Sequence, residues 1–256
     1  GDIVTLTILS VIWGGSFFFI EVLVDFLPPL TIVTLRVGLA AIFLWAIVLF
    51  RKLPLPDSFE KWRALFVLGL FNNALPFCLI VWAQTHISSG MASVLNATAP
   101  FFTVLVAGLY LADEKFSRNK FFGVIMGMIG TAVLIGPEAL QGLTGSMIGQ
   151  LAVMLAAFSY AVSGVFARRF KVWGISPMIV ATGQVTMATL VLIPLTAFID
   201  QPWTLSVPPY YAVAAILGLA LISTVIAYIL YFRLVSSAGA TNAALVTFLI
   251  PISAIL

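Results

Sequence analysis

One charged side chain stands out because it lies inside a long apolar stretch. Arg36 follows Pro29 by seven residues and has mostly aliphatic neighbours. A guanidinium in such surroundings attracts anionic groups, such as a carboxylate, and can bind them through several N–H donors at once. Glu21 is an acidic residue at similar depth on the preceding apolar stretch. Two interpretations therefore stay open: Arg36 binds an anionic substrate, or it forms a structural ion pair with Glu21.

Neutral polar and aromatic side chains inside the other apolar stretches complete the set of candidate binding residues. A buried amide needs a hydrogen-bond partner, which either a neighbouring helix or a substrate supplies. Aromatic rings provide walls for a cavity that takes amphipathic solutes. The candidate substrate-binding residues are Trp13, Ser16, Arg36, Asn73, Trp82, Tyr160, Gln184 and Tyr228. Packing between helices is the alternative interpretation of the neutral members.

Glycine and proline mark the places where helices can bend. Adjacent glycines weaken a helix, and a proline removes a backbone donor. The candidate hinge or kink positions are Gly14, Gly15, Pro76, Pro100 and Pro251. Close packing through small residues is the alternative explanation of the two glycines.

The composition excludes a water-soluble protein. The 256 residues are 62% hydrophobic and 8% charged, whereas ordinary soluble domains are roughly 25% charged. A membrane-spanning helix needs about 20 mostly apolar residues, and long continuous apolar runs favour helices over a membrane barrel. The sequence predicts nine helical spans, at about 3–24, 30–50, 64–84, 90–112, 120–137, 146–167, 175–199, 210–232 and 240–256.

The basic residues predict how these spans are oriented. Eleven of the twelve lysines and arginines fall on one side of the predicted membrane, and the opposite loops contain Asp25, His86, Glu138 and Asp200. Because cytoplasmic loops carry the excess of positive charge, we expect a cytoplasmic amino terminus. The basic residues lie in short loops rather than in one patch, so we expect no nucleic-acid partner.

Weak internal similarity predicts two copies of a five-helix unit. A spacing of 151 residues pairs Asn72–Asn73 with Ser223–Thr224, Phe77 with Tyr228 and Pro100 with Pro251. An odd number of helices per copy places the two copies inverted in the membrane, an arrangement typical of secondary transporters. The expected fold is all-α: a polytopic bundle of ten helices, nine of them visible, with repeats at 1–145 and 146–256. The second repeat shows only four helices, which suggests that the chain continues past its last residue.

No motif for catalysis or for a cofactor is present. The sequence has no nucleotide-binding loop, catalytic-triad spacing or zinc pattern. His86 has no partner cluster for a metal, and the single cysteine, Cys78, can form no internal disulfide. We therefore expect no enzyme activity, no cofactor and no metal. The inverted repeat disfavours a receptor, which leaves a transporter, with a passive channel or a broad-specificity efflux protein as the alternative.

The order and spacing of several motifs resemble the EamA-type permeases of the drug/metabolite transporter superfamily. The matching residues are Trp13-Gly14-x-Ser16-Phe17, Pro29 with Arg36, Pro100, Leu111-Ala112-Asp113-Glu114, and Gly123 with Gly130. The chain departs from the family at Asp113, where glycine is usual, and at Glu21, where many members carry lysine.

The resemblance implies export of amino acids or related metabolites across a bacterial inner membrane. Its expected partners are a small-molecule substrate and the lipid bilayer, and we expect a monomer. The resulting hypothesis is a secondary transporter of small amphipathic metabolites, most of all amino acids, that works by alternating access. Its central cavity would be lined by Arg36 and the neutral candidate residues.

Overall fold

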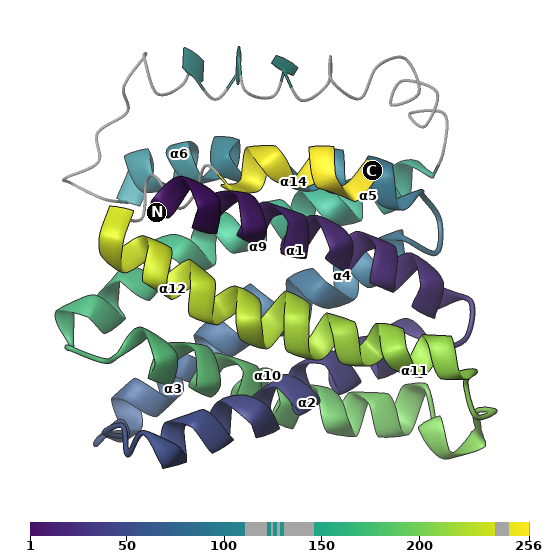
Figure 1. The fold of residues 1–256 in the computed structure, drawn as a ribbon, viewed down its shortest axis with the longest axis horizontal. Coiled ribbons are helices and arrows are strands. Elements are labelled where there is room, and N and C mark those ends of the chain that lie inside the picture. The colour runs from purple at the N-terminus through teal and green to yellow at the C-terminus, as the bar shows by residue number, and fades with distance from the viewer. Residues whose placement is uncertain (111–121, 124, 127–128, 131–145, 239–245, 256) are drawn as a thin grey trace.

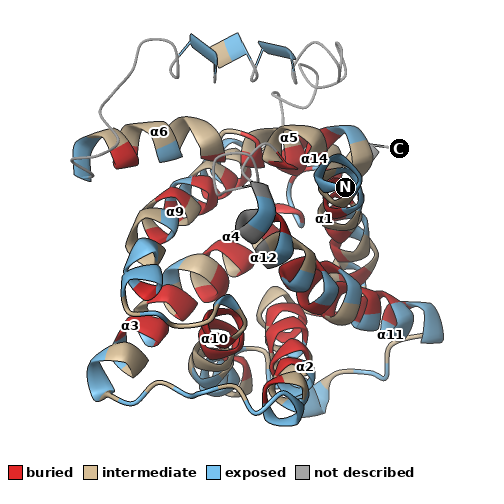
Figure 2. Ribbon diagram, turned by 60° about the vertical axis from the view of Figure 1, so that its left-hand side comes forward, coloured by how far each residue is buried: buried red, intermediate tan, exposed pale blue. Residues whose placement is uncertain are grey.

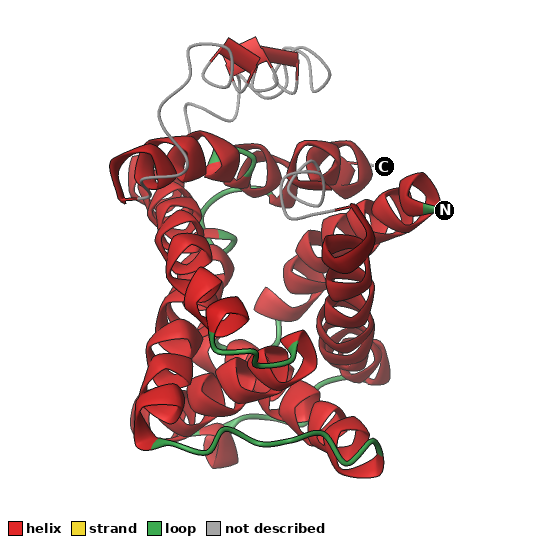
Figure 3. Cartoon of the chain, turned by 90° about the vertical axis from the view of Figure 1, so that its left-hand side faces the viewer, coloured by secondary structure: helices red, strands yellow, loops and turns green. Residues whose placement is uncertain are grey.

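The computed structural model describes residues 1–110, 122–123, 125–126, 129–130, 146–238 and 246–255. Helices are the only regular elements in these ranges, and short loops join most of them (Figures 1 and 3). In chain order the elements are α1 (Asp2–Val24), α2 (Pro29–Phe50), α3 (Phe59–Gly69), η1 (Leu70–Ala74), α4 (Leu75–Ala83), α5 (Ser89–Asn96), α6 (Ala99–Tyr110), α9 (Met147–Val172), α10 (Pro177–Ile199), η2 (Pro202–Thr204), α11 (Tyr210–Leu217), η3 (Gly218–Ile226), α12 (Ala227–Ala238) and α14 (Val246–Ile255).

Seven helical segments in the described ranges are long and apolar enough to cross a membrane. Each overlaps one predicted span, so the all-helical membrane bundle is confirmed. The predicted span 120–137 lies mostly outside the described residues, as do Asp113 and Glu114 of the family motif. Helix α14 is the described part of the predicted span 240–256. The count of ten helices therefore stays a prediction.

The outer surface of the bundle is apolar, as contact with lipid requires. Only 33–56% of the most apolar window of each span is buried inside the protein. Large side chains such as Phe18, Ile42 and Phe198 are more than half exposed. Figure 2 shows exposed residues on the outward sides of the helices and buried residues toward the interior. In water such a surface would aggregate, whereas in a bilayer the acyl chains cover it.

The loops gather at two opposite ends of the bundle. In Figure 1 the loop after α2, the loop between α9 and α10 and the carboxyl end of α12 lie on the left. The loops after α1, α4 and α10 lie on the right. The left-hand group carries basic residues, among them Arg51, Lys52 and Lys171, and the right-hand group contains Asp25 and Asp200. We call the left-hand end the basic end.

Serine residues begin four of the helices that follow loops. Ser58, Ser88, Ser146 and Ser176 each accept a hydrogen bond from the backbone N–H three residues later, at 3.2–3.4 Å. Each bond satisfies an N–H that has no acceptor within its helix and contributes about 1 kcal/mol. The four serines thus fix where α3, α5, α9 and α10 begin.

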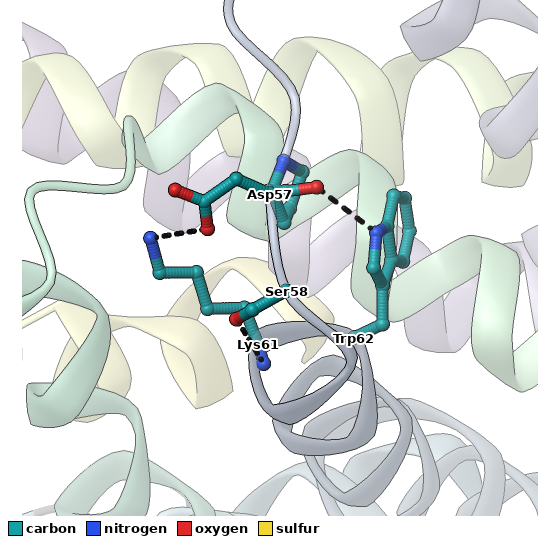
Figure 4. Close-up of polar contacts among 5 residues, drawn as sticks. Asp57, Ser58, Lys61 and Trp62 are labelled. Carbon is teal, nitrogen blue, oxygen red and sulfur yellow. Dashed lines mark hydrogen bonds and ion pairs between the residues drawn. The ribbon is translucent and has the colours of Figure 1, made fainter.

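Neighbouring side chains reinforce the start of α3 at the basic end (Figure 4). The ammonium group of Lys61 forms an ion pair of 2.8 Å with Asp57, and the indole N–H of Trp62 donates to the carbonyl of Pro56 at 3.2 Å. The hydrogen bond from Lys61, with its charge, lowers the pKa of the exposed Asp57 carboxyl. These contacts set the direction in which the chain enters the bundle.

The amino terminus of α2 takes its cap from another helix. Its own N-cap residue, Pro28, makes no side-chain hydrogen bond. Instead the Oδ2 atom of Asp200, at the end of α10, accepts from the backbone N–H of Thr31 at 2.7 Å and from its hydroxyl at 2.8 Å. The carboxylate satisfies an unpaired donor at the positive end of the helix dipole. This cap ties together residues 169 positions apart.

The α2–α10 interface continues inward through paired neutral groups. The hydroxyls of Thr34 and Thr196 lie 2.6 Å apart, and the indole N–H of Trp45 donates to Thr186 at 2.9 Å. Val37, fully buried, lies on the same helix between these contacts. Each polar group therefore meets a partner on the facing helix, because an unpaired one in hydrocarbon is costly.

Gly14 is a position of close contact with α14. A Cβ atom on Gly14 would overlap the Oγ atom of Ser253 and lie 2.9 Å from the backbone nitrogen of Ala254. A Cβ on Gly15 would meet nothing within 4 Å. Helix α1 runs unbroken through both glycines. The geometry therefore favours the packing interpretation for Gly14, and a hinge at Gly15 stays a prediction.

We expect Asp200→Ala to lower the melting temperature of the purified protein in detergent. The substitution leaves the Thr31 N–H unpaired, which costs about 1–3 kcal/mol of unfolding free energy. The matched control is Asp25→Ala, which removes an exposed acid from the loop after α1. Equal melting temperatures for the two variants would show that the cap does not stabilise the fold.

Two neighbouring substitutions separate packing from helix flexibility. Gly14→Ala should destabilise the protein by about 1–3 kcal/mol, since overpacking pushes α1 away from α14. Gly15→Ala should leave the melting temperature unchanged or raise it, because alanine favours a helix. Size-exclusion profiles and thermal melting of the two variants test this. A Gly14→Ala protein as stable as the unmodified one would contradict the close contact.

Candidate functional site

Arg36, the charged residue of the second apolar stretch, lies within α2 and is 6% exposed. Its Nε donates to the hydroxyl of Thr224 on η3 at 3.0 Å. Its guanidinium carbon lies 3.8 Å from the ring centroid of Phe77 on α4. The hydroxyls of Tyr160 and Tyr228 lie close enough to interact electrostatically with the guanidinium. No carboxylate of the described residues forms an ion pair with Arg36. The guanidinium is thus held by neutral groups.

The predicted alternative, an ion pair between Arg36 and Glu21, does not form. Glu21 is exposed on α1, and its carboxylate accepts a hydrogen bond from Ser89 at 2.5 Å. Glu21 lies on the surface of its helix whereas Arg36 lies in the interior, so equal depth does not bring them together. The structural ion pair is therefore wrong, and the role of Arg36 as an anion-binding group stays a prediction.

Asn73 on η1 is fully buried and only half satisfied. Its Oδ1 accepts a hydrogen bond from the hydroxyl of Tyr228 at 2.7 Å. Its Nδ2 has no partner among the described residues. A buried unpartnered amide costs about 1–3 kcal/mol, which a bound water or ligand would remove. Asn73 is one helical turn from Phe77, which contacts Arg36. We call Arg36, Asn73, Phe77, Thr224 and Tyr228 the arginine cluster.

A second polar cluster surrounds Asn72, the neighbour of Asn73. The Nδ2 of Asn72 donates to Gln184 on α10 at 2.8 Å, and its Oδ1 accepts from Ser163 on α9 at 2.8 Å. Gln184 and Ser163 are 3% and 1% exposed. Both Nδ2 and Oδ1 of Asn72 therefore form a hydrogen bond, whereas in Asn73 only Oδ1 does. We call Asn72, Ser163 and Gln184 the amide cluster.

The two clusters share one construction. Each contains polar residues of a π-helical segment, η1 or η3, within a longer helix. The doublets Asn72–Asn73 and Ser223–Thr224 lie 151 residues apart in these segments. Helix α2 supplies Arg36 to η3, and α10 supplies Gln184 to η1. The wider π turn re-aims the side chains of a helix and frequently occurs at functional sites.

The contacts with α1 and α9 follow the same pairing. Ser223 of η3 donates to the carbonyl of Ile12 on α1 at 3.1 Å, and Asn72 of η1 meets Ser163 on α9. Ile12 and Ser163 are again 151 residues apart. This is the relation expected between two copies of one structural unit.

The structure brings some predicted binding residues together and separates others. Arg36, Asn73 and Tyr228 belong to the arginine cluster, and Gln184 belongs to the amide cluster. The ring of Tyr160 lies 6.5 Å from that of Phe77, edge to face. These residues come from five helical segments, which sequence alone could not bring together.

The remaining three predicted binding residues contact other groups. The ring of Trp13 lies 5.6 Å from that of Tyr231. The hydroxyl of Ser16 donates back to the carbonyl of Trp13 at 2.5 Å, so this donor is already used. The ring of Trp82 lies 4.5 Å from that of His86 near the end of α4. These contacts favour the packing interpretation, and substrate contact by the three residues stays a prediction.

The predicted kink prolines occupy three different settings. Pro76 is the second residue of α4 and follows η1 directly, where the π turn accommodates a residue without an N–H. Pro100 is the second residue of α6, beside the break that separates α5 from α6. Pro251 lies inside α14, which stays helical from Val246 to Ile255.

Sequence reasoning did not place Phe77, Thr224 or Ser163 among the binding residues. The repeat spacing contained a signal for two of them. Phe77 pairs with Tyr228, and Thr224 pairs with Asn73, at 151 residues. Applying the spacing to each predicted binding residue would have found both partners.

The arginine cluster offers hydrogen-bond donors rather than metal ligands. The described residues contain no group of three or more histidines, cysteines, aspartates and glutamates that could hold a metal ion. The guanidinium of Arg36 and the free amide of Asn73 lie beside the rings of Phe77 and Tyr228. Such a set can bind an anionic group together with an apolar or aromatic moiety.

Comparison with known proteins gives a consistent family assignment. The EamA-like transporter family matches residues 2–136 and 147–256. The uncharacterized transporter YoaV of Bacillus subtilis (strain 168) is 26% identical, over 98% of this chain and 86% of its own length. The uncharacterized transporter YdfC of the same organism is 30% identical, over 96% and 78%. The uncharacterized inner membrane transporter YedA of Escherichia coli (strain K12) is 28% identical, over 97% and 78%.

A solved crystal structure has the same fold. It superposes with a TM-score of 0.73 over 99% of this chain and 86% of that chain, at 18% sequence identity. The family match covers nearly all of the sequence, and seven apolar helices can cross the membrane. The protein is therefore a multi-pass membrane transporter, and it belongs to the EamA-like transporter family.

Proposed function

We propose that this protein is a secondary transporter that exports small amphipathic metabolites, foremost amino acids, across a bacterial inner membrane. One observation carries the proposal. A buried guanidinium without a described acidic partner lies near a buried amide whose Nδ2 donor is unused. A charge in a membrane interior is costly and usually faces a cavity or a pathway. An anionic substrate group would satisfy both Arg36 and Asn73.

The surroundings of these donors favour a carboxylate joined to an apolar side chain. The terminal nitrogens of Arg36 can bind two carboxylate oxygens at once, and Asn73 adds a third N–H. The rings of Phe77, Tyr160 and Tyr228 provide an aromatic wall. A sugar would need more hydrogen-bonding groups than this wall offers, and an inorganic cation would be repelled by Arg36.

The paired clusters support an alternating-access mechanism. We propose it for a monomer whose amino terminus is cytoplasmic, an orientation that the grouping of basic residues favours. The arginine cluster joins η3 to α2, and the amide cluster joins η1 to α10. In the proposed cycle, one cluster opens while the other stays closed, so that the site faces each side in turn. The bonds of the amide cluster are neutral, and such bonds between membrane helices contribute only about 0.6 kcal/mol on average, so they can exchange readily.

We expect Arg36→Gln to weaken transport of carboxylate substrates in proteoliposomes. Loss of charge-assisted bonds costs about 1.5–3 kcal/mol, which is a rise of about 10- to 100-fold in KM. Measurements of amino-acid counterflow should show this rise in KM. An amide analogue of the same amino acid, which has no carboxylate, should inhibit transport by the two proteins equally well. Arg36→Lys should retain part of the affinity because it keeps the charge.

The control for Arg36→Gln is Arg51→Gln, which removes an exposed charge at the basic end. Size-exclusion profiles must match before the rates are compared. Full saturable transport by Arg36→Gln would exclude the substrate-binding role. Flux that rises with concentration without saturation, in the unmodified protein, would instead support a passive channel.

Asn73→Asp tests the unused amide without changing its size. The substitution keeps an oxygen for the hydroxyl of Tyr228 and replaces the Nδ2 donor by an acceptor. A carboxylate substrate should then bind at least about 10-fold more weakly, because a charge-assisted donor is lost and a negative charge is introduced. Asn96→Asp, which alters a buried asparagine of α5, serves as the control. Unchanged KM values in Asn73→Asp would show that the amide does not contact substrate.

A further inference from the structure

A groove between α3 and α9 opens at the basic end of the bundle. Its mouth is a cavity of about 170 Å³ with seven lining residues, which are Glu60, Arg63, Ala64, Val67, Phe166, Arg169 and Trp173. The α3 members lie at positions i, i+3, i+4 and i+7, and the other three residues, at the end of α9, are three and four residues apart, so each helix presents one face. Two arginines and one glutamate give this mouth a net positive charge.

A second, apolar cavity continues the groove inward. It measures about 90 Å³ and is lined by Val67, Leu68, Phe71, Val162, Ser163 and Phe166. Val67 and Phe166 line both cavities, so the two lie next to each other along the same pair of helices. From position 60 to position 71 the groove follows eleven helical residues, or roughly 16 Å at 1.5 Å per residue. This is about half of the ~30 Å hydrocarbon thickness, the depth of one leaflet.

The basic residues at the mouth are available for an anion. The guanidinium of Arg169 lies 3.6 Å from the ring centroid of Phe166, and its Nε donates to the Phe166 carbonyl at 3.1 Å. These two contacts use the Nε of Arg169 and one face of its guanidinium. Arg63 faces it from α3, and neither arginine pairs with a carboxylate of the described residues. Trp173 adds the amphipathic ring that is typical of the headgroup level.

We propose that this groove binds an anionic phospholipid, whose phosphate lies between Arg63 and Arg169 and whose acyl chain follows α3 inward. Charge complementarity selects the headgroup, and the apolar inner cavity selects a lipid over a soluble phosphate. Basic pockets between membrane helices bind anionic headgroups in this way. The inner end of the groove reaches Ser163, which bonds Asn72 of the amide cluster. A lipid in this groove would therefore contact one of the polar clusters from outside.

The test measures lipid binding rather than transport, so its outcome is independent of the proposed substrate. Purified protein in detergent is titrated with palmitoyl-oleoyl phosphatidylglycerol, with the matching phosphatidylcholine, and with inorganic phosphate. Melting temperature and native mass spectrometry report binding, since a ligand of the folded state raises stability. Phosphatidylglycerol should stabilise the protein at lower concentration than phosphatidylcholine, and phosphate alone should not reproduce the shift.

Variants locate the site. Arg63→Gln with Arg169→Gln should weaken phosphatidylglycerol binding by about 30-fold, at roughly 1 kcal/mol for each basic residue. Arg51→Gln with Lys171→Gln removes the same charge at the same end and should leave binding nearly unchanged. Val67→Trp should block both lipids by filling the groove. The single variant Arg63→Gln, at an exposed position, serves if the double variant does not fold.

Three results would overturn the proposal. Equal affinity for the two lipids would remove the charge-selective headgroup site. A shift reproduced by inorganic phosphate would assign the arginines to a soluble anion instead of a lipid. Equal loss of binding in the control pair would show that general surface charge, rather than this groove, attracts the lipid.

Discussion

The buried charge of Arg36 is the constraint on which the polar interior depends. A guanidinium in an apolar bundle must find compensation, and here the described partners are one hydroxyl and one aromatic ring rather than an acid. The charge is thus positioned without being cancelled. Burial costs several kcal/mol, which structural packing alone does not explain, because an uncharged residue of similar size would pack at lower cost.

The two π-helical segments supply the interior with polar side chains in a place where regular helices would not. Each segment presents a polar doublet to helices from the other half of the chain, through Arg36 and Thr224 in one cluster and Gln184 and Asn72 in the other. The Asn72–Gln184 bond is neutral and of a kind that is individually weak, whereas the Arg36–Thr224 bond has a charged donor and a neutral acceptor. By contrast, the Asp200 carboxylate caps α2 with two charge-assisted bonds. The carboxylate cap thus lies at the periphery of the bundle, and the contacts of the two clusters lie in its interior.

Glu21 shows why a sequence pattern can mislead about pairing. Its depth matches that of Arg36 on the next helix, but depth is only one of two coordinates; the direction in which a side chain leaves its helix is the other. The apolar stretches have little amphipathic periodicity because lipid and protein interior are both apolar. The pattern that reveals the buried face of a soluble helix is therefore weak here, and Glu21 lies on the exposed side.

The sequence by itself determined the class of the protein, the approximate spans and the grouping of basic residues at one end. Those properties depend on composition and segment length, because hydrocarbon admits only closed backbone hydrogen bonding. It also contained the 151-residue spacing that relates the polar doublets. Only the tertiary structure decided which candidate residues meet. Tyr160, Tyr228 and Arg36 converge, whereas Trp13 and Trp82 pack elsewhere, because helix rotation and the π turns set side-chain direction, and these depend on contacts between distant helices.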